Sequence, residues 1–246
     1  MWKKVVPWAL AVLMGAGVAS AQDLTLDQVL ARHYEAIGGL EAWQNVQSMR
    51  AVGRIALMPG TEAPFEMVVM RPHKMRMEFT FQGMTGVQAY DGTTAWMIMP
   101  FMGKTEPEPM PADMAKDVIE QSDLDGPLIG YKEDGNQIEL AGLVDVEGTK
   151  AYQLKVTLEN GDVQNYFLDA EYFVPIKIEG SRTVQGNLVE FETVISDYKD
   201  VGGLMIAHSI ESKPKGAPAG QAITLDTVEI NPTVDESIFT MPGAGN

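Results

Sequence analysis

Hydrophobic and polar residues alternate along most of this chain, most clearly between residues 65 and 81. One parity is almost entirely apolar, whereas polar residues occupy the other. Successive side chains of a β-strand point to opposite faces, so this period of two predicts one long strand over residues 65–81 with a single apolar face. The residues on that parity are Phe65, Met67, Val69, Arg71, Met75, Met77, Phe79 and Phe81.

Arg71 is the charged residue on this otherwise apolar parity. Placing an unpaired guanidinium in apolar surroundings is strongly unfavourable, so we expect Arg71 to have a carboxylate or carbonyl partner. Methionine is flexible and suits a ligand of variable shape better than a uniquely packed core. The pattern therefore suggests a cavity for a hydrophobic ligand that is controlled by Arg71. The alternatives are an ordinary packed core and, for Arg71, a salt bridge at the rim of the sheet.

The same alternation continues through the rest of the chain and predicts a mainly β (α+β) fold. Short turn signals such as Asp91-Gly92 and Asn160-Gly161 join consecutive strands, which makes these strands antiparallel neighbours. We expect one antiparallel sheet of about ten to eleven strands, which must curl into a half-open barrel because it is so wide. The other expected strands are residues 49–57, 85–90, 94–99, 137–146, 150–159, 164–168, 174–181, 188–198, 204–212 and 222–230.

Two helical segments are expected beside the sheet. Thr25 can cap a first helix with Gln28 three residues later, and Gly38-Gly39 can end it, with a short second turn at residues 40–43. An insert at about residues 104–131 interrupts the alternation and contains a second helix from Ala112. We expect this insert to lie as a lid across the open apolar face, closing it together with the first helix. The proposed lid residues are Met110, Met114, Val118 and Ile119, and Met97 and Met99 are proposed to complete the lining of the acyl cavity.

The first residues have the features of a secretory signal peptide. Lys3 and Lys4 precede a short apolar run, and Ala19-Ser20-Ala21 is a small-residue cleavage site. We expect residues 1–21 to be removed and residues 22–246 to form one soluble domain in the periplasm. The chain has no cysteine, which excludes a disulfide and an anchor on an acylated cysteine.

Charge and composition exclude several classes of partner and chemistry. Without Lys3 and Lys4 the chain keeps 16 basic and 34 acidic residues, a net charge of about −18, so nucleic acid is not an expected partner. The three histidines, His33, His73 and His208, lie on separate elements, and the methionines lack the clustered spacing of a copper carrier. No nucleophile motif is present, so we expect no catalytic residues, no metal and no cofactor.

Several short segments together resemble the LolA-type periplasmic lipoprotein carriers, in an uncharacterised lipoprotein-sorting-like branch. These segments occur in the same order as in that family, over most of the chain that follows the signal peptide. The segments are Val69-Met70-Arg71-Pro72 with Met75 to Phe79, Tyr90-Asp91-Gly92-Thr93-Thr94-Ala95-Trp96, Met99-Pro100-Phe101, and Asn231-Pro232 with Phe239 and Pro242.

This resemblance implies a half-open barrel with an apolar cavity for acyl chains, closed by helices. Arg71 matches the arginine that bonds the lid shut in that family, whereas Met75 stands where the family has an aromatic residue. It implies a monomeric carrier of lipids or acylated lipoproteins, loaded by an inner-membrane complex and unloaded to an outer-membrane acceptor. The alternatives are a ligand-sensing regulatory module of the same fold and an enzyme acting on an envelope lipid or glycan.

Overall fold

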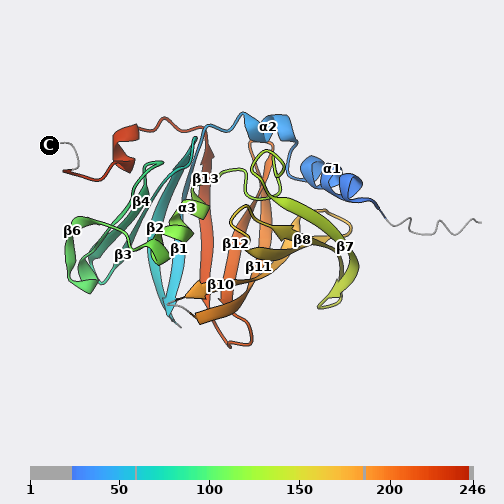
Figure 1. The fold of residues 1–246 in the computed structure, drawn as a ribbon. Coiled ribbons are helices and arrows are strands. Elements are labelled where there is room, and N and C mark those ends of the chain that lie inside the picture. Colours follow the sequence, from blue (N-terminus) through green and yellow to red (C-terminus); the bar gives the residue numbers. More distant parts are fainter. Residues whose placement is uncertain (1–23, 59, 185–186, 244–246) are drawn as a thin grey trace, which may run out of the picture.

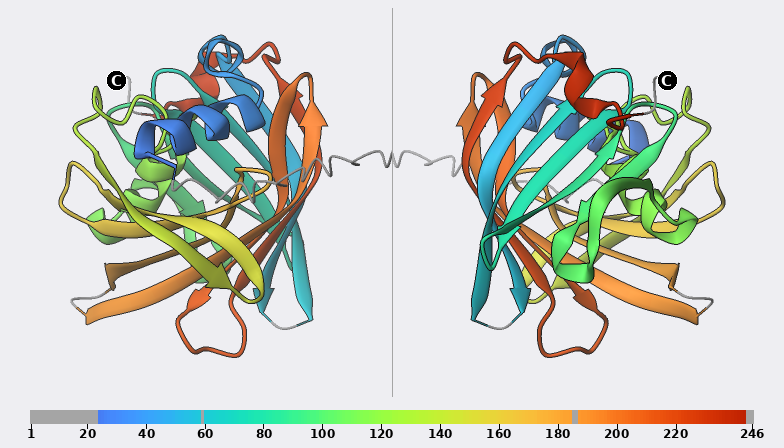
Figure 2. Two further views of the ribbon diagram at one scale, coloured as in Figure 1. Left: turned by 90° about the vertical axis from the view of Figure 1, so that its right-hand side faces the viewer. Right: turned by 90° about the vertical axis from the view of Figure 1, so that its left-hand side faces the viewer.

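The computed structural model describes residues 24–58, 60–184 and 187–243, and in these residues the chain forms one 13-stranded sheet (Figure 1). All neighbouring strands are antiparallel, in the order β6-β5-β4-β3-β2-β1-β13-β12-β11-β10-β9-β8-β7. The sheet is strongly curved and open on one side (Figure 2). The prediction of a mainly β half-open barrel is therefore confirmed. The expected signal peptide lies outside the described residues.

The elements follow one another in a simple order along the chain. The helices are α1 Leu26–Ala36, α2 Leu40–Gln44, η1 Pro100–Met102, α3 Ala112–Gln121 and η2 Glu236–Phe239. The strands are β1 Ser48–Met58, β2 Thr61–Met70, β3 Lys74–Phe81, β4 Met84–Tyr90, β5 Ala95–Met99, β6 Lys104–Pro109, β7 Gln137–Val146, β8 Thr149–Thr157, β9 Val163–Asp169, β10 Pro175–Val184, β11 Asn187–Val201, β12 Leu204–Pro214 and β13 Gln221–Ile230.

The prediction of one continuous strand over residues 65–81 is wrong, because β2 and β3 form a hairpin there. The turn consists of Arg71, Pro72 and His73, with a cis bond before Pro72 and a positive φ of 47° at His73. Proline has no N–H for the strand ladder, so a turn at this position is physically reasonable. The register pairs Met70 with Lys74, and it pairs Phe65, Met67 and Val69 of β2 with Phe79, Met77 and Met75 of β3. The hairpin therefore keeps the expected apolar residues on one face.

The second difference in strand number is β6, which lies within the expected lid insert. It pairs with β5 at one edge of the sheet, with Pro109 opposite Trp96. Prolines are tolerated on an edge strand because their missing N–H groups face away from the ladder. The insert thus begins as a strand, and only α3 and the loop that follows it cross the sheet. These two additions explain why the structure has 13 strands.

Two hydrophobic clusters fill the concave side of the sheet. One lies under α1, whose Val29 and Leu30 pack with Leu154 and Leu168 of β8 and β9. The predicted cap of α1 is confirmed, since Thr25 and Gln28 form a capping box. The other cluster lies under α3, mainly on strands β1 to β5, and it includes Leu204 and Ile206 of β12 and Leu225 of β13. The helices therefore cover opposite halves of the same concave face.

The C-terminal segment covers part of the convex face. The indole N–H of Trp96 donates a hydrogen bond of 2.7 Å to the carbonyl of Phe239, and both side chains are fully buried. This segment therefore packs on the side of the sheet opposite the two hydrophobic clusters.

Candidate functional site

The apolar residues expected to line a cavity gather on the concave face of β2 to β5. Most of them are buried, and three are half-buried. The buried residues are Phe65, Val69, Met75, Met77, Met97 and Met99, and the half-buried residues are Met67, Phe79 and Phe81. All but Phe81 belong to one packed cluster, and Phe81 meets Phe101 edge to face at 6.0 Å. The hairpin brings these residues together although it replaces the expected single strand.

The helix α3 fills the space over this apolar face. Met110 and Val118 are buried in the cluster, and Met114 packs against it. Ile119 was expected on the same face, but its side chain is 42% exposed. Residues 114 and 118 are four apart and share a helical face, whereas residue 119 is turned by about 100° from 118. In this structure the chain's own side chains therefore occupy the apolar face.

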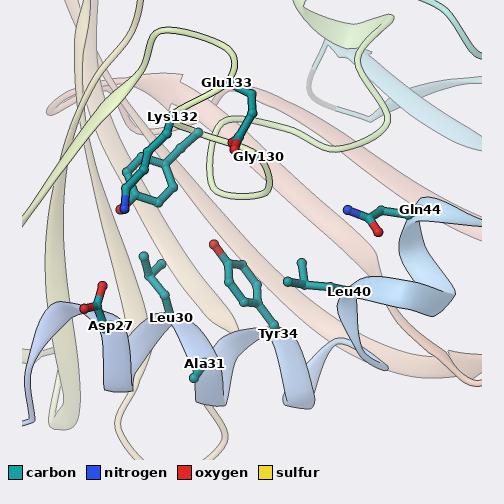
Figure 3. A pocket seen from close by; sticks show the side chains of 10 residues that line it. Asp27, Leu30, Ala31, Tyr34, Leu40, Gln44, Gly130, Lys132 and Glu133 are labelled. Carbon is teal, nitrogen blue, oxygen red and sulfur yellow. The ribbon is translucent and has the colours of Figure 1, made fainter.

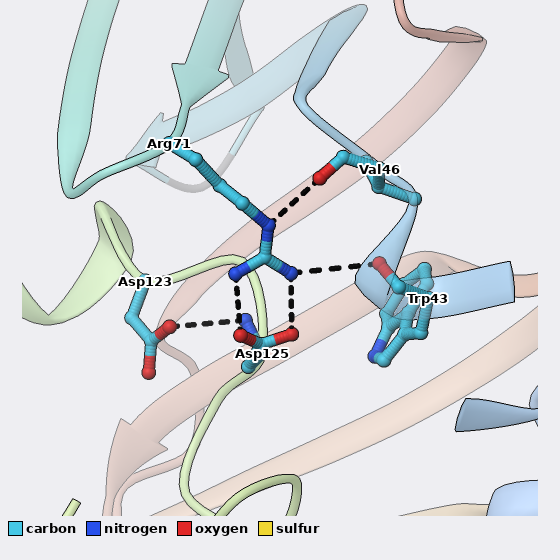
Figure 4. Close-up of polar contacts among 5 residues, drawn as sticks. All are labelled: Trp43, Val46, Arg71, Asp123 and Asp125. Atoms are coloured by element: carbon cyan, nitrogen blue, oxygen red, sulfur yellow. Dashed lines mark hydrogen bonds and ion pairs between the residues drawn. The ribbon is translucent and has the colours of Figure 1, made fainter. Parts of the chain in front are cut away.

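Arg71 connects three segments at the rim of this cluster (Figure 4). Its guanidinium donates two hydrogen bonds to the carboxylate of Asp125, of 2.5 and 2.6 Å, and its Nε donates one of 2.7 Å to the carbonyl of Val46. A longer contact of 3.5 Å reaches the carbonyl of Trp43 in α2. Arg71 thus ties the β2–β3 turn to α2 and to the loop that follows α3.

The electrostatic surroundings of this contact are acidic. Hydrogen bonding to Asp125 raises the pKa of Arg71, and the charge of Asp123 raises it further. Burial and the charges of Asp123 and Asp125 raise the pKa of Asp134 in the same loop. One guanidinium therefore holds together a loop whose carboxylates repel one another.

A second ion pair, which the sequence did not indicate, fixes α3 to the opposite half of the sheet. Lys116 of α3 donates a short hydrogen bond to the carboxylate of Asp162, in the turn between β8 and β9. This contact raises the pKa of Lys116. The helix and its following loop are therefore tied to the sheet on both sides.

Between α3 and the second half of the sheet lies a cavity of about 690 Å³, which we call the inner cavity. In the described part of the chain, none of the expected cavity or lid residues lines it. Its lining is His73, Asp117, Glu120, Gln121, Asp123, Gly126, Pro127, Asp134, Asn136, Leu158, Glu159, Asn160, Gln164, Tyr166, Ile178, Phe191, Thr193, Ile210, Ser212 and Gln221. Sequence reasoning missed this site because its residues come from many segments that are far apart in the chain.

A second hollow of about 600 Å³, the outer pocket, lies between α1, α2 and residues 130–133 (Figure 3). Leu30, Tyr34 and Leu40 form its apolar side. The hydroxyl of Tyr34 donates a 2.8 Å hydrogen bond to the carbonyl of Leu128, and burial raises the pKa of Tyr34 to about 12. This bond fixes α1 to the loop that contains Asp125.

The described residues contain neither a group of side chains that could hold a metal ion nor a helix that could cross a membrane. No group of three or more His, Cys, Asp or Glu side chains among them is arranged to hold a metal ion. None of the described helices is both long enough and apolar enough to cross a membrane.

Comparison with known proteins relates the fold to solved structures. No protein-family model and no curated protein matches the sequence. An outer membrane lipoprotein-sorting protein domain from Vibrio parahaemolyticus is 12% identical with a TM-score of 0.57, covering 86% of this chain and 94% of its own. A LolA superfamily protein from Nitrosomonas europaea is 15% identical with a TM-score of 0.56, covering 88% and 98%.

A DUF1329 family protein from Desulfovibrio piger is 11% identical with a TM-score of 0.58, and the match covers 86% of this chain and 97% of that protein. At such identities a likeness establishes the architecture alone. On that ground this chain has a LolA-like fold, as its Arg71-Pro72, Asp91-Gly92 and Pro100-Phe101 segments led us to expect.

Proposed function

We propose that this protein is a carrier that binds lipids or acylated lipoproteins in the cell envelope and releases them without chemical change. The observation that supports this most is the apolar face of β2 to β5, which is filled by a helix and not by the sheet alone. An insert that covers an apolar surface can be displaced by a ligand that covers the same surface. The described conformation is then the closed, empty state.

The energetics of binding favour acyl chains as the ligand. Each buried methylene contributes about 0.8 kcal/mol, so one chain of ordinary length can compete with the side chains of α3. Met110, Met114 and Val118 would leave the apolar face as the acyl chain enters. The methionines on the sheet, such as Met75 and Met77, can adapt their shape to different chains.

Release requires that the empty state is also stable. When α3 returns to the apolar face, Arg71 regains its two hydrogen bonds with Asp125, which stabilises the protein without cargo. Arg71 therefore controls the balance between the loaded and empty states and not affinity alone.

The same proposal includes the expected location and partners. Residues 22–246 act as one monomeric domain in the periplasm after removal of residues 1–21. Cargo comes from an inner-membrane loading complex and passes to an outer-membrane acceptor. The LolA-like fold and the names of the matched structures from Vibrio and Nitrosomonas support this assignment.

Native mass spectrometry of protein purified from its own periplasm without detergent tests the proposal. We expect adducts whose masses correspond to acylated molecules and which dissociate when an excess of fatty acid is added. Protein that carries no acyl adduct and takes none up from added diacyl lipid would contradict a carrier function. Co-purification of a membrane regulator in place of acyl cargo would favour the sensing module.

A further inference from the structure

Two turns at one end of the sheet contain no charged residue. They join β3 to β4 and β5 to β6, strands that lie together at the left of the sheet in Figure 1. Between residues 79 and 103, Asp91 is the sole charged residue of the sequence, and it lies in the β4–β5 turn at the other end of these strands. We call Phe81–Met84 and Pro100–Gly103 the apolar tip.

Four large apolar side chains belong to the apolar tip. Phe81 and Met84 are opposite each other in the register of β3 and β4, so they share the concave face. Both are half-buried, as is Phe101, whose ring contacts that of Phe81. Met102 is 62% exposed. The tip therefore presents apolar side chains to the solvent.

Other turns of the same sheet carry charged residues. Glu147 lies in the β7–β8 turn, Glu159 and Asp162 lie in the β8–β9 turn, and Lys215 begins the β12–β13 turn. Charged residues at exposed turns keep a protein soluble, whereas an exposed group of apolar residues typically marks a contact with a membrane or another protein. The apolar tip thus differs from these turns in the way expected of a contact surface.

The apolar tip is continuous with the apolar face that we propose as the cargo site. Phe79 and Phe101 pack against the cluster under α3, and their ring centroids are 5.6 Å apart. Gly86 lies opposite Phe79, and a Cβ at Gly86 would come within 2.8 Å of Phe79 and 2.9 Å of Phe101. This glycine lets both rings lie close to β4. Apolar side chains therefore run from the buried cluster to Met102.

A lipid bilayer is the partner that fits an uncharged, apolar tip. The chain without Lys3 and Lys4 has a net charge of about −18, and a protein that recognised it by charge would need acidic residues in the contact. The tip offers none, and it can enter the bilayer surface without removing water from an ion. Burial of Met and Phe side chains among acyl chains is favourable.

We propose that the apolar tip inserts into the surface of a lipid bilayer that has little net charge, and that cargo passes between the apolar face and the bilayer at this end of the sheet. The passage of cargo rests on the proposed carrier function, whereas the contact between the tip and lipid does not. An acyl chain that leaves by this route moves from one apolar environment to another.

Flotation with vesicles of dioleoyl phosphatidylcholine, whose head group has no net charge, tests the inference. We expect the wild type to bind these vesicles, with no weakening at high salt because the contact involves no ion pair. Met102→Asp removes apolar surface and adds a charge, so it should lower the partition constant about tenfold or more. Vesicles of dioleoyl phosphatidylglycerol should bind less protein at low salt, because their charge repels the acidic chain.

Leu188→Asp is the matched control, because Leu188 is also an exposed apolar residue, 73% exposed, but lies on β11. This variant should bind vesicles as the wild type does. Equal binding by Met102→Asp, an equal loss in Leu188→Asp, or a preference for the anionic vesicles would overturn the inference. Binding only to native membranes that keep their proteins would assign the tip to a protein partner and also overturn it.

Binding of a fluorescent fatty acid in solution, measured on the same proteins, separates this inference from the carrier function. Met102→Asp should bind the fatty acid as the wild type does, because Met102 does not belong to the cluster under α3. A wild type that binds the fatty acid but no vesicles would overturn the inference alone. A wild type that binds vesicles but no fatty acid would contradict the carrier function and support the contact between the tip and lipid.

Discussion

Arg71 and Asp125, 54 positions apart in the chain, face each other through two parallel hydrogen bonds between guanidinium and carboxylate. Arg71 stands in the β2–β3 turn, and Asp125 follows α3 by four residues. The side chains are 26% and 22% exposed, so water screens the pair only partly. This contact holds the segment that fills the apolar face.

The first prediction concerns this pair. Arg71→Leu removes the contact that favours the empty state, so the variant should retain cargo but deliver it poorly. A partly buried pair is worth about 1 kcal/mol, which corresponds to roughly a fivefold shift toward the loaded state. Transfer of a labelled acyl cargo to acceptor vesicles measures this effect.

A surface arginine supplies the control for this experiment. Arg54→Leu removes a 3.0 Å ion pair between Arg54 and Asp226. The side chains of both residues are about half-exposed. Delivery by this variant should match the wild type. If Arg71→Leu also delivered cargo at the wild-type rate, the proposed role of Arg71 would be wrong.

The second prediction concerns Lys116 and Asp162. Their side chains are 40% and 33% exposed, so the pair should contribute at most about 1 kcal/mol and be weakened by salt. Asp162→Lys should speed hydrogen exchange of the α3 amides at low salt, and the added substitution Lys116→Asp should slow it again. No rescue by the reversed pair would show that this contact does not hold α3.

Much of the sheet could be predicted from the sequence. Successive side chains of a strand point to opposite faces, so polar and apolar residues alternate wherever one face is buried. The three-residue turn at residues 71–73 kept this parity, so the apolar face was recognised although the strand was not. Edge strand β6 was missed because Pro107 and Pro109 are typical of loops, and only pairing with β5 makes them strand residues. Asp125, Asp162 and the inner cavity depend on contacts between distant segments, for which no local pattern exists.

The third prediction concerns pH and His33. The ring is 4% exposed and donates a 2.8 Å hydrogen bond from Nδ1 to the carbonyl of Phe173. Burial lowers the pKa of His33 below its ordinary 6.5, and this hydrogen bond opposes the shift. The unfolded chain therefore binds the proton more readily. The contribution of His33 to stability is present above pH 6.5 and is lost as the pH falls toward the lowered value.

Urea unfolding at pH 7.5 and pH 5.5 measures this effect. His33→Gln keeps an N–H donor but does not titrate, so it should lose less stability than the wild type between these pH values. The same loss in both proteins would assign the pH dependence to other groups.

The fourth prediction compares two neighbouring glycines after α1. Gly38 and Gly39 have positive φ angles of 109° and 95°, so alanine at either position is strained by about 1–3 kcal/mol. A Cβ at Gly38 would also lie 2.2 Å from the carbonyl oxygen of Gly203, whereas a Cβ at Gly39 has no neighbour within 4 Å. Gly38→Ala should therefore be the more destabilising in urea unfolding. Equal losses would show that the backbone near Gly203 moves freely.

The fifth prediction tests whether α3 competes with the ligand for the apolar face. Val118 is 2% exposed and belongs to the cluster, so Val118→Ala should weaken the closed state by about 1.5 kcal/mol. A fatty acid that needs the face uncovered should then bind about tenfold more tightly. Displacement of a fluorescent fatty acid measures this affinity.

Ile119 gives the control on the same helix, because its side chain is 42% exposed and does not belong to the cluster. Ile119→Ala removes more atoms than Val118→Ala, yet it should leave the affinity nearly unchanged. If hydrophobicity of the helix alone mattered, the two variants would behave alike. A tighter fatty acid complex in Val118→Ala alone would show that packing of Val118 in the closed state opposes binding, whereas weaker binding would mean that Val118 contacts the bound chain directly.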